Sequence, residues 1–274
     1  MNTSIRNQGL DVLKAVLAWL VILGHILQIQ IANGNTDFLS GQIEYFIYSF
    51  HMPLFIAITG YFLYGKKVEI QSFIKKRSVQ LLVPCLVFGL IIGFYDYFIG
   101  HSSIQLAVKD FILSDLWYLK SLYIILLVSL PFLLFRTNIS KVIGVVIVLA
   151  ISALFGGIFL LALQAPAFLF GYFLHAFEVR LEGKKLISII IFVIALLLFV
   201  SELTIFRPDI NTNCLNILQF NSSAEFVNYA NRILLALTGI LVIFFAFKRI
   251  KWGGGTFNNR KIFTWHLLYS KFDY

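Results

Sequence analysis

The first hydrophobic segment of this chain carries three ionisable side chains, Asp11, Lys14 and His25. On an α-helix, the eleven-residue step from Lys14 to His25 returns to within about 20° of the same direction and rises about 16 Å. The two side chains therefore share one helix face at different depths, and Asp11 lies within reach of an ion pair with Lys14. Ionisable groups inside a membrane span usually line a path for a substrate, an ion or a proton, so we expect this polar stripe to face protein.

A structural interpretation stays open for these side chains. Lys14 can extend along its helix to the lipid headgroups beside Asp11, and His25 can bond to a neighbouring helix. His25 fits this interpretation less well, because it lies well inside the apolar segment. The imidazole is therefore the stronger candidate for a functional group.

Composition predicts a membrane protein that crosses the bilayer several times. Hydrophobic residues make up 59% of the 274 residues and charged residues 13%, with a mean hydropathy of +0.88. A soluble domain has about a quarter of its residues charged. Spans of about 20 residues leave no room for a sizeable soluble domain, so an active site must be built from helices and short loops. No repeat or linker divides the chain, and we expect a single domain over residues 1–274.

The apolar runs predict an all-α, polytopic membrane helical bundle with about eight or nine transmembrane helices. Pro53 is expected to break the second helix, and the run that begins at Pro166 is short for a span, which together suggest helices packed around a cavity. The expected spans are 10–31, 43–64, 79–99, 117–135, 142–163, 166–179, 186–206 and 231–248, with a weaker ninth segment from about 262 to the end.

The charge pattern predicts the orientation of these spans. The net charge is +9, and the basic residues lie in loops between apolar runs rather than on one amphipathic surface. They therefore indicate membrane topology and not a nucleic-acid partner. The loop 65–78 holds five basic residues and one acid, whereas loop 32–42 has no Lys or Arg. The positive-inside rule then places loop 65–78 and the N-terminus in the cytoplasm. His51, on the returning second helix, is expected at nearly the depth of His25.

Several stretches resemble, in chain order, the integral-membrane acyltransferase 3 family, which O-acetylates bacterial surface polysaccharides and related glycans. The family's first helix carries a basic residue ten residues before a His, as Lys14 and His25 do here. Its second helix resembles HMPLFIAITGYF, residues 51–62, with Thr59 in the position of a serine. Further similar stretches are FIKKRSVQLLVP at 73–84, LWYL at 116–119 and FLFGYFL at 168–174.

The sequence also departs from the family pattern in two places. The family often shows R-x-x-R before the third helix, whereas Gln80 stands three residues after Arg77 here. The family usually has about ten spans, which is more than this chain offers. These differences leave two interpretations open: a C-terminally truncated domain, or a divergent short member of the family.

The resemblance implies a multi-pass O-acyltransferase of the bacterial inner (cytoplasmic) membrane. It implies acetyl-CoA as the acyl-donor substrate without a metal, and a hydroxyl of a surface polysaccharide or a lipid-linked sugar as the acceptor. His25 would be catalytic, as a general base or an acyl carrier. Basic side chains would attract the CoA phosphates, and further residues would shape the substrate pocket. The donor-binding residues are Lys14, Lys75, Lys76 and Arg77, and the pocket residues are Asp11, His51 and Thr59.

Two alternatives of another kind accompany this interpretation. A transporter or flippase of glycan precursors would use the same polar stripe to move a charged substrate, and an inactive truncated family member would have no activity. Transporters often contain two matching halves. No second copy of the Lys14 to His25 spacing or of the HMPLF stretch occurs, which disfavours a transporter. His175 and Glu178 are most simply a polar cluster at a membrane interface.

Overall fold

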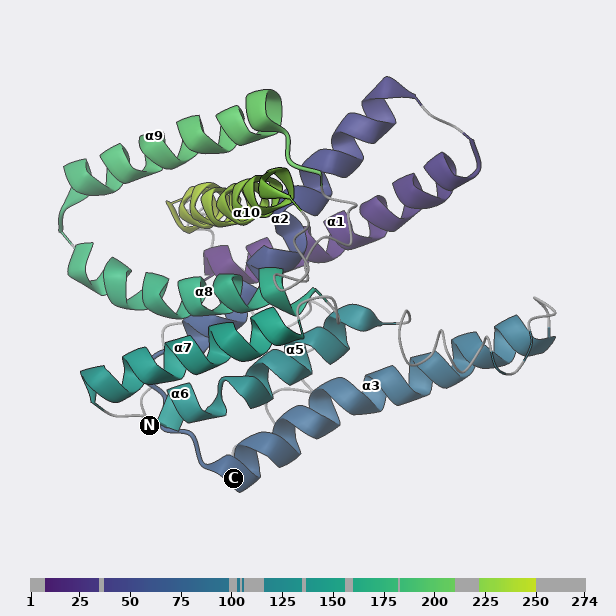
Figure 1. The fold of residues 1–274 in the computed structure, drawn as a ribbon, viewed down its shortest axis with the longest axis horizontal. Helices are drawn as coiled ribbons and strands as arrows, with labels where there is room; N and C mark the ends of the chain where they lie inside the picture. Colours follow the sequence, from purple (N-terminus) through teal and green to yellow (C-terminus); the bar gives the residue numbers. More distant parts are fainter. Residues whose placement is uncertain are drawn as a thin grey trace, which may run out of the picture.

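The protein is a bundle of α-helices. The computed structural model describes residues 8–34, 37–98, 103, 105, 116–134, 137–155, 160–181, 183–209 and 222–249. Over these residues it contains helices and turns but no strand, which confirms the all-α prediction (Figure 1). The elements are α1 (Gln8–Ala32), α2 (Phe38–Leu63), α3 (Ile70–Phe98), α5 (Trp117–Val128), α6 (Leu130–Leu134), α7 (Asn138–Leu154), α8 (Leu161–Leu181), α9 (Lys185–Ser201), the π-helix η1 (Glu202–Phe206) and α10 (Ser223–Arg249).

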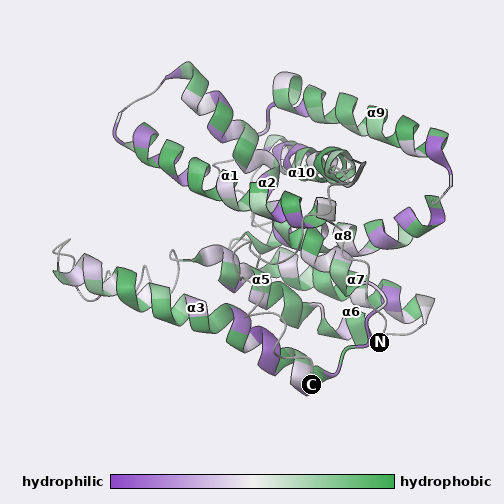
Figure 2. Cartoon of the chain, turned by 180° about the vertical axis from the view of Figure 1, so that it is seen from behind, coloured by the Kyte–Doolittle hydropathy of each residue, from purple (hydrophilic) through white to green (hydrophobic). Residues whose placement is uncertain are grey.

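Helix length and hydropathy identify a membrane bundle. Five helices are long and apolar enough to cross a bilayer, namely Gly9–Ala32, Phe38–Leu63, Ile70–Tyr95, Lys185–Phe206 and Ser223–Phe247. Helices α3 and α9 are mostly hydrophobic along their length, apart from polar residues near their ends (Figure 2), and Leu90 and Leu197 among their residues are 68% and 65% exposed. Apolar surface of this extent is unusual on a soluble monomer and is suited to lipid. The protein is therefore a multi-pass membrane protein.

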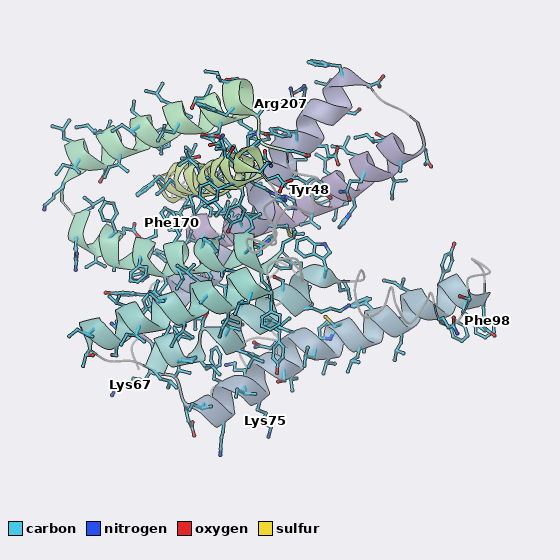
Figure 3. All side chains as sticks on the ribbon, in the orientation of Figure 1. Tyr48, Lys67, Lys75, Phe98, Phe170 and Arg207 are labelled. Carbon is cyan, nitrogen blue, oxygen red and sulfur yellow. The ribbon has the colours of Figure 1, made fainter. Side chains whose placement is uncertain are left out.

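The ends of the helices lie at two opposite ends of the bundle. In the view of Figure 1 most helices run across the picture and the chain reverses at its left and right sides. Lys67 and Lys75 lie at the lower left and bottom of the view, near the start of α3, whereas Phe98, at the other end of α3, lies at the far right (Figure 3). The basic connection between α2 and α3 thus lies at one end of the bundle, as a cytoplasmic face would require.

Each of the eight expected spans corresponds to helix, but many of the ends differ. Helix α3 begins at Ile70 rather than at 79, α7 ends at Leu154 rather than at 163, and α10 begins at Ser223 rather than at 231. The expected span 117–135 is divided at Ser129 into α5 and α6, and α7 begins earlier than expected because Thr137 and Ser140 form a capping box. Helix α2 continues through Pro53, contrary to the expected break. The segment around Pro166 is not short, because helix α8 begins at Leu161. The weaker ninth segment lies outside the described residues.

The reason that α8 tolerates Pro166 is visible in its neighbour α10. A proline has no N–H, so it leaves the carbonyl four residues earlier without its helical donor. That carbonyl belongs to Ala162, and the Tyr229 hydroxyl donates a hydrogen bond to it over 3.0 Å. A side chain from α10 thus replaces the missing backbone donor, which is how membrane helices commonly accommodate proline.

Helix α2 is the centre of the bundle, with 72% of its most apolar window buried inside the protein. Its closest partner is α8. A Cβ atom added to Gly60 would collide with the Phe168 carbonyl oxygen, and one added to Gly171 would collide with the Ala57 carbonyl oxygen. The two helices can approach this closely only because these positions carry no side chain. Helix α2 is therefore held firmly, and so are the side chains that it presents to α1.

Candidate active site

Helices α1 and α2 meet at the residue immediately before His25. A Cβ atom added to Gly24 would lie 3.1 Å from Cε2 of Tyr48 and 3.3 Å from its hydroxyl oxygen, so the tyrosine ring packs against the bare backbone of α1. The other side of the contact is on α2, where the Tyr48 and His51 rings meet edge to face with centroids 4.8 Å apart. Through Tyr48, the segment of α1 that carries His25 lies against the part of α2 that carries His51.

His51 has one ring nitrogen engaged and one available. Its side chain is fully buried, at 0% exposure, and its Nδ1 lies 2.6 Å from the carbonyl oxygen of Ile47. A carbonyl only accepts hydrogen bonds, so Nδ1 carries the proton and Nε2 carries a lone pair. Within the described residues, Nε2 has no hydrogen-bond partner. Buried polar groups are normally paired, so this nitrogen requires an explanation.

His25 differs from the expectation that the whole polar stripe faces protein. Its side chain is exposed within the described part of the chain, whereas Gly24 and Leu27 on the adjoining face of α1 are buried. The stripe therefore lies at the edge of the α1–α2 contact rather than inside it. Within the described part of the chain, no neighbouring helix covers the His25 side chain.

Lys14 lies toward the opposite end of α1, where its contacts include Asp11 and Phe62. Its Nζ is 3.9 Å from Oδ1 of Asp11, with both side chains partly exposed at 42% and 34%, and such pairs contribute little to stability. The same Nζ lies 4.4 Å from the centre of the Phe62 ring on α2, a cation–π contact. Asp11 and Phe62 thus place the lysine charge near the inner end of α2.

The other basic side chains predicted to bind the donor lie on α3. Lys75 and Lys76 are exposed, while Arg77 donates a hydrogen bond to Gln80 over 3.1 Å and lies 5.4 Å from the centre of the Phe73 ring. Helix α3 packs mainly on α5, not on α1. The structure therefore does not bring these three residues together around Lys14. Lys14 lies near the start of α1, and the other three lie near the start of α3.

The pocket candidate Thr59 uses its hydroxyl locally. The Thr59 hydroxyl donates to the Phe55 carbonyl oxygen over 3.1 Å, along its own helix. Its predicted role in a pocket therefore has no contact to support it in the structure. Among the described residues, no cluster of three or more His, Cys, Asp or Glu side chains has the arrangement of a metal site.

Sequence reasoning missed a polar network between α2 and α8. The Tyr61 hydroxyl donates to Oε2 of Glu178 over 2.6 Å, and Nδ1 of His175 lies 3.2 Å from the Tyr61 carbonyl oxygen. The His175 ring also stacks on Tyr64, with centroids 4.9 Å apart. The interfacial cluster expected at His175 and Glu178 is thus bonded specifically to the end of α2. The signal in the sequence was the pair of tyrosines Tyr61 and Tyr64 at the end of α2, which does not identify their partners on α8.

Comparison with known proteins gives one match over nearly the whole chain. A family model described as "Acyltransferase domain" matches residues 7–265. Nodulation protein NolL of Sinorhizobium fredii is 33% identical over 121 residues, which are 42% of this chain and 33% of that protein. Nodulation protein NolL of Mesorhizobium japonicum is 41% identical over 87 residues, which are 31% of this chain and 23% of that protein. The matched stretches thus span a third or less of these relatives. No solved structure matches the chain significantly.

Proposed function

Because the chain belongs to the acyltransferase 3 family, we propose that it is a membrane O-acyltransferase. It takes an acetyl group from cytoplasmic acetyl-CoA and passes it to a hydroxyl of a surface polysaccharide or a lipid-linked sugar, in a bacterial inner membrane. The observation that carries this proposal is the family match over residues 7–265, which includes the whole α1–α2 site.

In this proposal His25 carries out the proton transfer. Its exposed ring can reach an acceptor hydroxyl that the buried His51 cannot reach. As the hydroxyl oxygen attacks the acetyl carbonyl carbon, the O–H proton passes to a neutral ring nitrogen of His25. The C–S bond to CoA then breaks, and the imidazolium returns the proton to the departing thiolate. An acyl-histidine route differs only in that the His25 nitrogen receives the acetyl group first.

The donor's phosphates belong at the other end of α1. Lys14 is separated from His25 by a rise of about 16 Å along the helix, and the pantetheine arm of CoA likewise separates its phosphates from its thioester. Lys14 is a point charge suited to a phosphate. Lys75, Lys76 and Arg77, at the start of α3, add positive charge that attracts an anionic donor to this end of the bundle.

The test uses purified protein in vesicles with radiolabelled acetyl-CoA and a panel of glycans. We expect covalently labelled glycan from the parent protein and a loss of at least about a hundredfold in the His25→Ala variant, since a general base is typically worth that much. His175→Ala removes a partly buried imidazole from the α2–α8 network and is the matched control, which should retain transfer. Passage of glycan across the vesicle without covalent label would instead indicate a flippase and overturn the proposal.

A further inference from the structure

We propose that three aromatic side chains of α2, namely Tyr48, Phe55 and Phe62, form the surface that binds the acetyl-pantetheine arm of the donor, with the Tyr48 hydroxyl bonded to the acetyl carbonyl oxygen. These three residues are called the aromatic stripe below. The inference rests on the proposed acyl transfer at His25. It adds a catalytic hydroxyl to that reaction, and it identifies the surface that connects the two ends of α1.

The aromatic stripe follows one face of α2. Its three residues are seven positions apart, and seven residues make almost two full turns of an α-helix, so the rings point in similar directions. In the described part of the chain Tyr48 and Phe55 are partly buried and Phe62 is exposed. From Tyr48 to Phe62 the stripe is about 21 Å long. It is therefore an apolar surface that the described helices leave partly open.

The polar face of α1 runs beside the aromatic stripe, as two contacts show. At the inner end, Nζ of Lys14 lies 4.4 Å from the centre of the Phe62 ring. At the outer end, a Cβ atom added to Gly24 would lie 3.3 Å from the Tyr48 hydroxyl oxygen. Lys14 and His25 share one face of α1. The face that reaches Phe62 at one end of the stripe therefore carries the imidazole at the other end.

The Tyr48 hydroxyl can bind a ligand beside His25. Its ring contacts Gly24 and the His51 ring, but among the described residues the structure shows no hydrogen bond from its hydroxyl. Consecutive Cα atoms are about 3.8 Å apart, so the hydroxyl oxygen lies within about 9 Å of the His25 Cα atom. A phenolic O–H is a hydrogen-bond donor. An acetyl group placed between Tyr48 and His25 can therefore contact both side chains.

The chemistry of the donor fits both ends of the aromatic stripe. The phosphates of acetyl-CoA are anions, and the Lys14 ammonium lies over Phe62 at the inner end. The pantetheine arm is a narrow chain of methylene and amide groups, which the Phe55 ring can contact between the ends. The Tyr118 ring on α5 lies 5.8 Å from the Phe55 ring, measured between centres, so a second helix borders the stripe. The stripe thus leads from the phosphate site to the imidazole.

In this arrangement Tyr48 stabilises the charge that develops on the acetyl oxygen. As the acceptor oxygen bonds to the carbonyl carbon, the acetyl oxygen becomes negative and the acceptor proton passes to His25. The Tyr48 O–H keeps its proton and donates a hydrogen bond to this oxyanion. When the C–S bond breaks, the carbonyl group forms again and the CoA thiolate receives the proton from His25. Tyr48 is unchanged at the end of the reaction.

Removing the hydroxyl alone tests the role of Tyr48. Tyr48→Phe keeps the ring against α1. We expect kcat to fall about a hundredfold to a thousandfold with the KM for acetyl-CoA nearly unchanged, since an oxyanion donor acts mainly in the transition state. Tyr45→Phe is the matched control, because this hydroxyl bonds the Pro208 carbonyl oxygen instead, and it should retain the parent kcat. Equal kcat in Tyr48→Phe and the parent protein would overturn the catalytic role.

A ketone analogue of acetyl-CoA, in which a methylene group replaces the thioester sulfur, tests the aromatic stripe without acyl transfer. We expect Phe55→Leu to raise the Kd of this analogue several-fold, because part of the apolar contact is lost. Phe46→Leu, at a ring of α2 that packs toward Phe199 of α9, should leave the Kd unchanged. With an isotopic label in the ketone, the infrared carbonyl band of the bound analogue should move to higher wavenumber in Tyr48→Phe, since the carbonyl oxygen loses its hydrogen bond.

The outcomes separate this inference from the proposed function. An unchanged Kd in Phe55→Leu would mean that the aromatic stripe faces lipid, and an unchanged carbonyl band in Tyr48→Phe would remove the hydroxyl from the donor site. Either result overturns the inference even if the parent protein acetylates a glycan. If the parent transfers no acetyl group but both variants change as expected, the proposed acyl transfer fails while the donor surface stands. Failure of the parent to bind the analogue would overturn both.

Discussion

Replacing Gly60 by alanine tests the packing that holds the site in place. The added Cβ would collide with the backbone carbonyl oxygen of Phe168 on α8, and no side-chain rotation can relieve a collision with backbone. Overpacking of this kind typically costs about 1–3 kcal/mol. Alanine is also more favourable than glycine inside a helix by about 1 kcal/mol. A control variant must therefore also replace a helical glycine by alanine.

Gly41 supplies that control within the same helix. A Cβ atom added there meets nothing within 4 Å, and the Gly41 N–H already donates to Asp37 in the helical ladder. Gly60→Ala should therefore be less stable than Gly41→Ala by about 1–3 kcal/mol. In a chain of this size, a loss of 1 kcal/mol lowers the melting temperature by about 2–4 °C. We therefore expect Gly60→Ala to melt roughly 2–12 °C below Gly41→Ala.

The measurement is thermal unfolding of the purified variants in one detergent. Equal melting temperatures for Gly60→Ala and Gly41→Ala would refute the backbone contact between α2 and α8. Gly171→Ala gives an independent check from the α8 side, because its Cβ would collide with the Ala57 carbonyl oxygen. Since one shift of α8 relieves both collisions, the double variant should lose less stability than the sum of the two single variants.

Three further predictions concern charge, topology and the α2–α8 network. Lys14→Met should raise the KM for acetyl-CoA with kcat retained, whereas Lys14→Arg should keep both near the parent values, as steady-state kinetics would show; an unchanged KM in the Met variant would make Lys14 an interfacial anchor. A reporter fused after Lys76 should be active only as a cytoplasmic reporter, and one fused after Asn33 only as an external reporter; the opposite pattern would reverse the donor side. Tyr61→Phe removes the hydroxyl that donates to Glu178 and should lower the free energy of unfolding by about 1–3 kcal/mol, because the partly buried carboxyl group of Glu178 loses this hydrogen bond. An unchanged melting temperature would contradict this.

Local patterns were sufficient to predict the helices but not their exact ends. Apolar runs near 20 residues gave the eight segments, because lipid requires such runs whatever the packing. The ends depended on contacts made elsewhere. Helix α8 starts at Leu161 rather than at Pro166 because Tyr229, more than sixty residues away, satisfies the carbonyl that the proline leaves free. Such a partner is not visible in the local sequence.

For the candidate site, the sequence predicted which residues share a helix face but not what packs between the helices. The spacing of Lys14 and His25 placed them on one helix face, and helix direction placed His51 near the depth of His25. Neither argument involved Tyr48, whose ring packs beside Gly24 and against His51. A glycine before the histidine and a tyrosine three residues before the second histidine were present as signals, but only the crossing of α1 and α2 gives them meaning. The separation of Lys75 from Lys14 likewise depends on where α3 packs.

The bond from Tyr229 to the Ala162 carbonyl oxygen bears on the order in which the bundle assembles. Until α10 docks, that carbonyl has neither its helical donor nor the Tyr229 hydroxyl, and leaving a buried carbonyl unpaired costs about 1–3 kcal/mol. Helix α8 is thus incomplete when it first inserts, and its N-terminal turn becomes stable only when a segment made later docks on it. A chain interrupted before α10 would lack the hydroxyl that completes the first turn of α8.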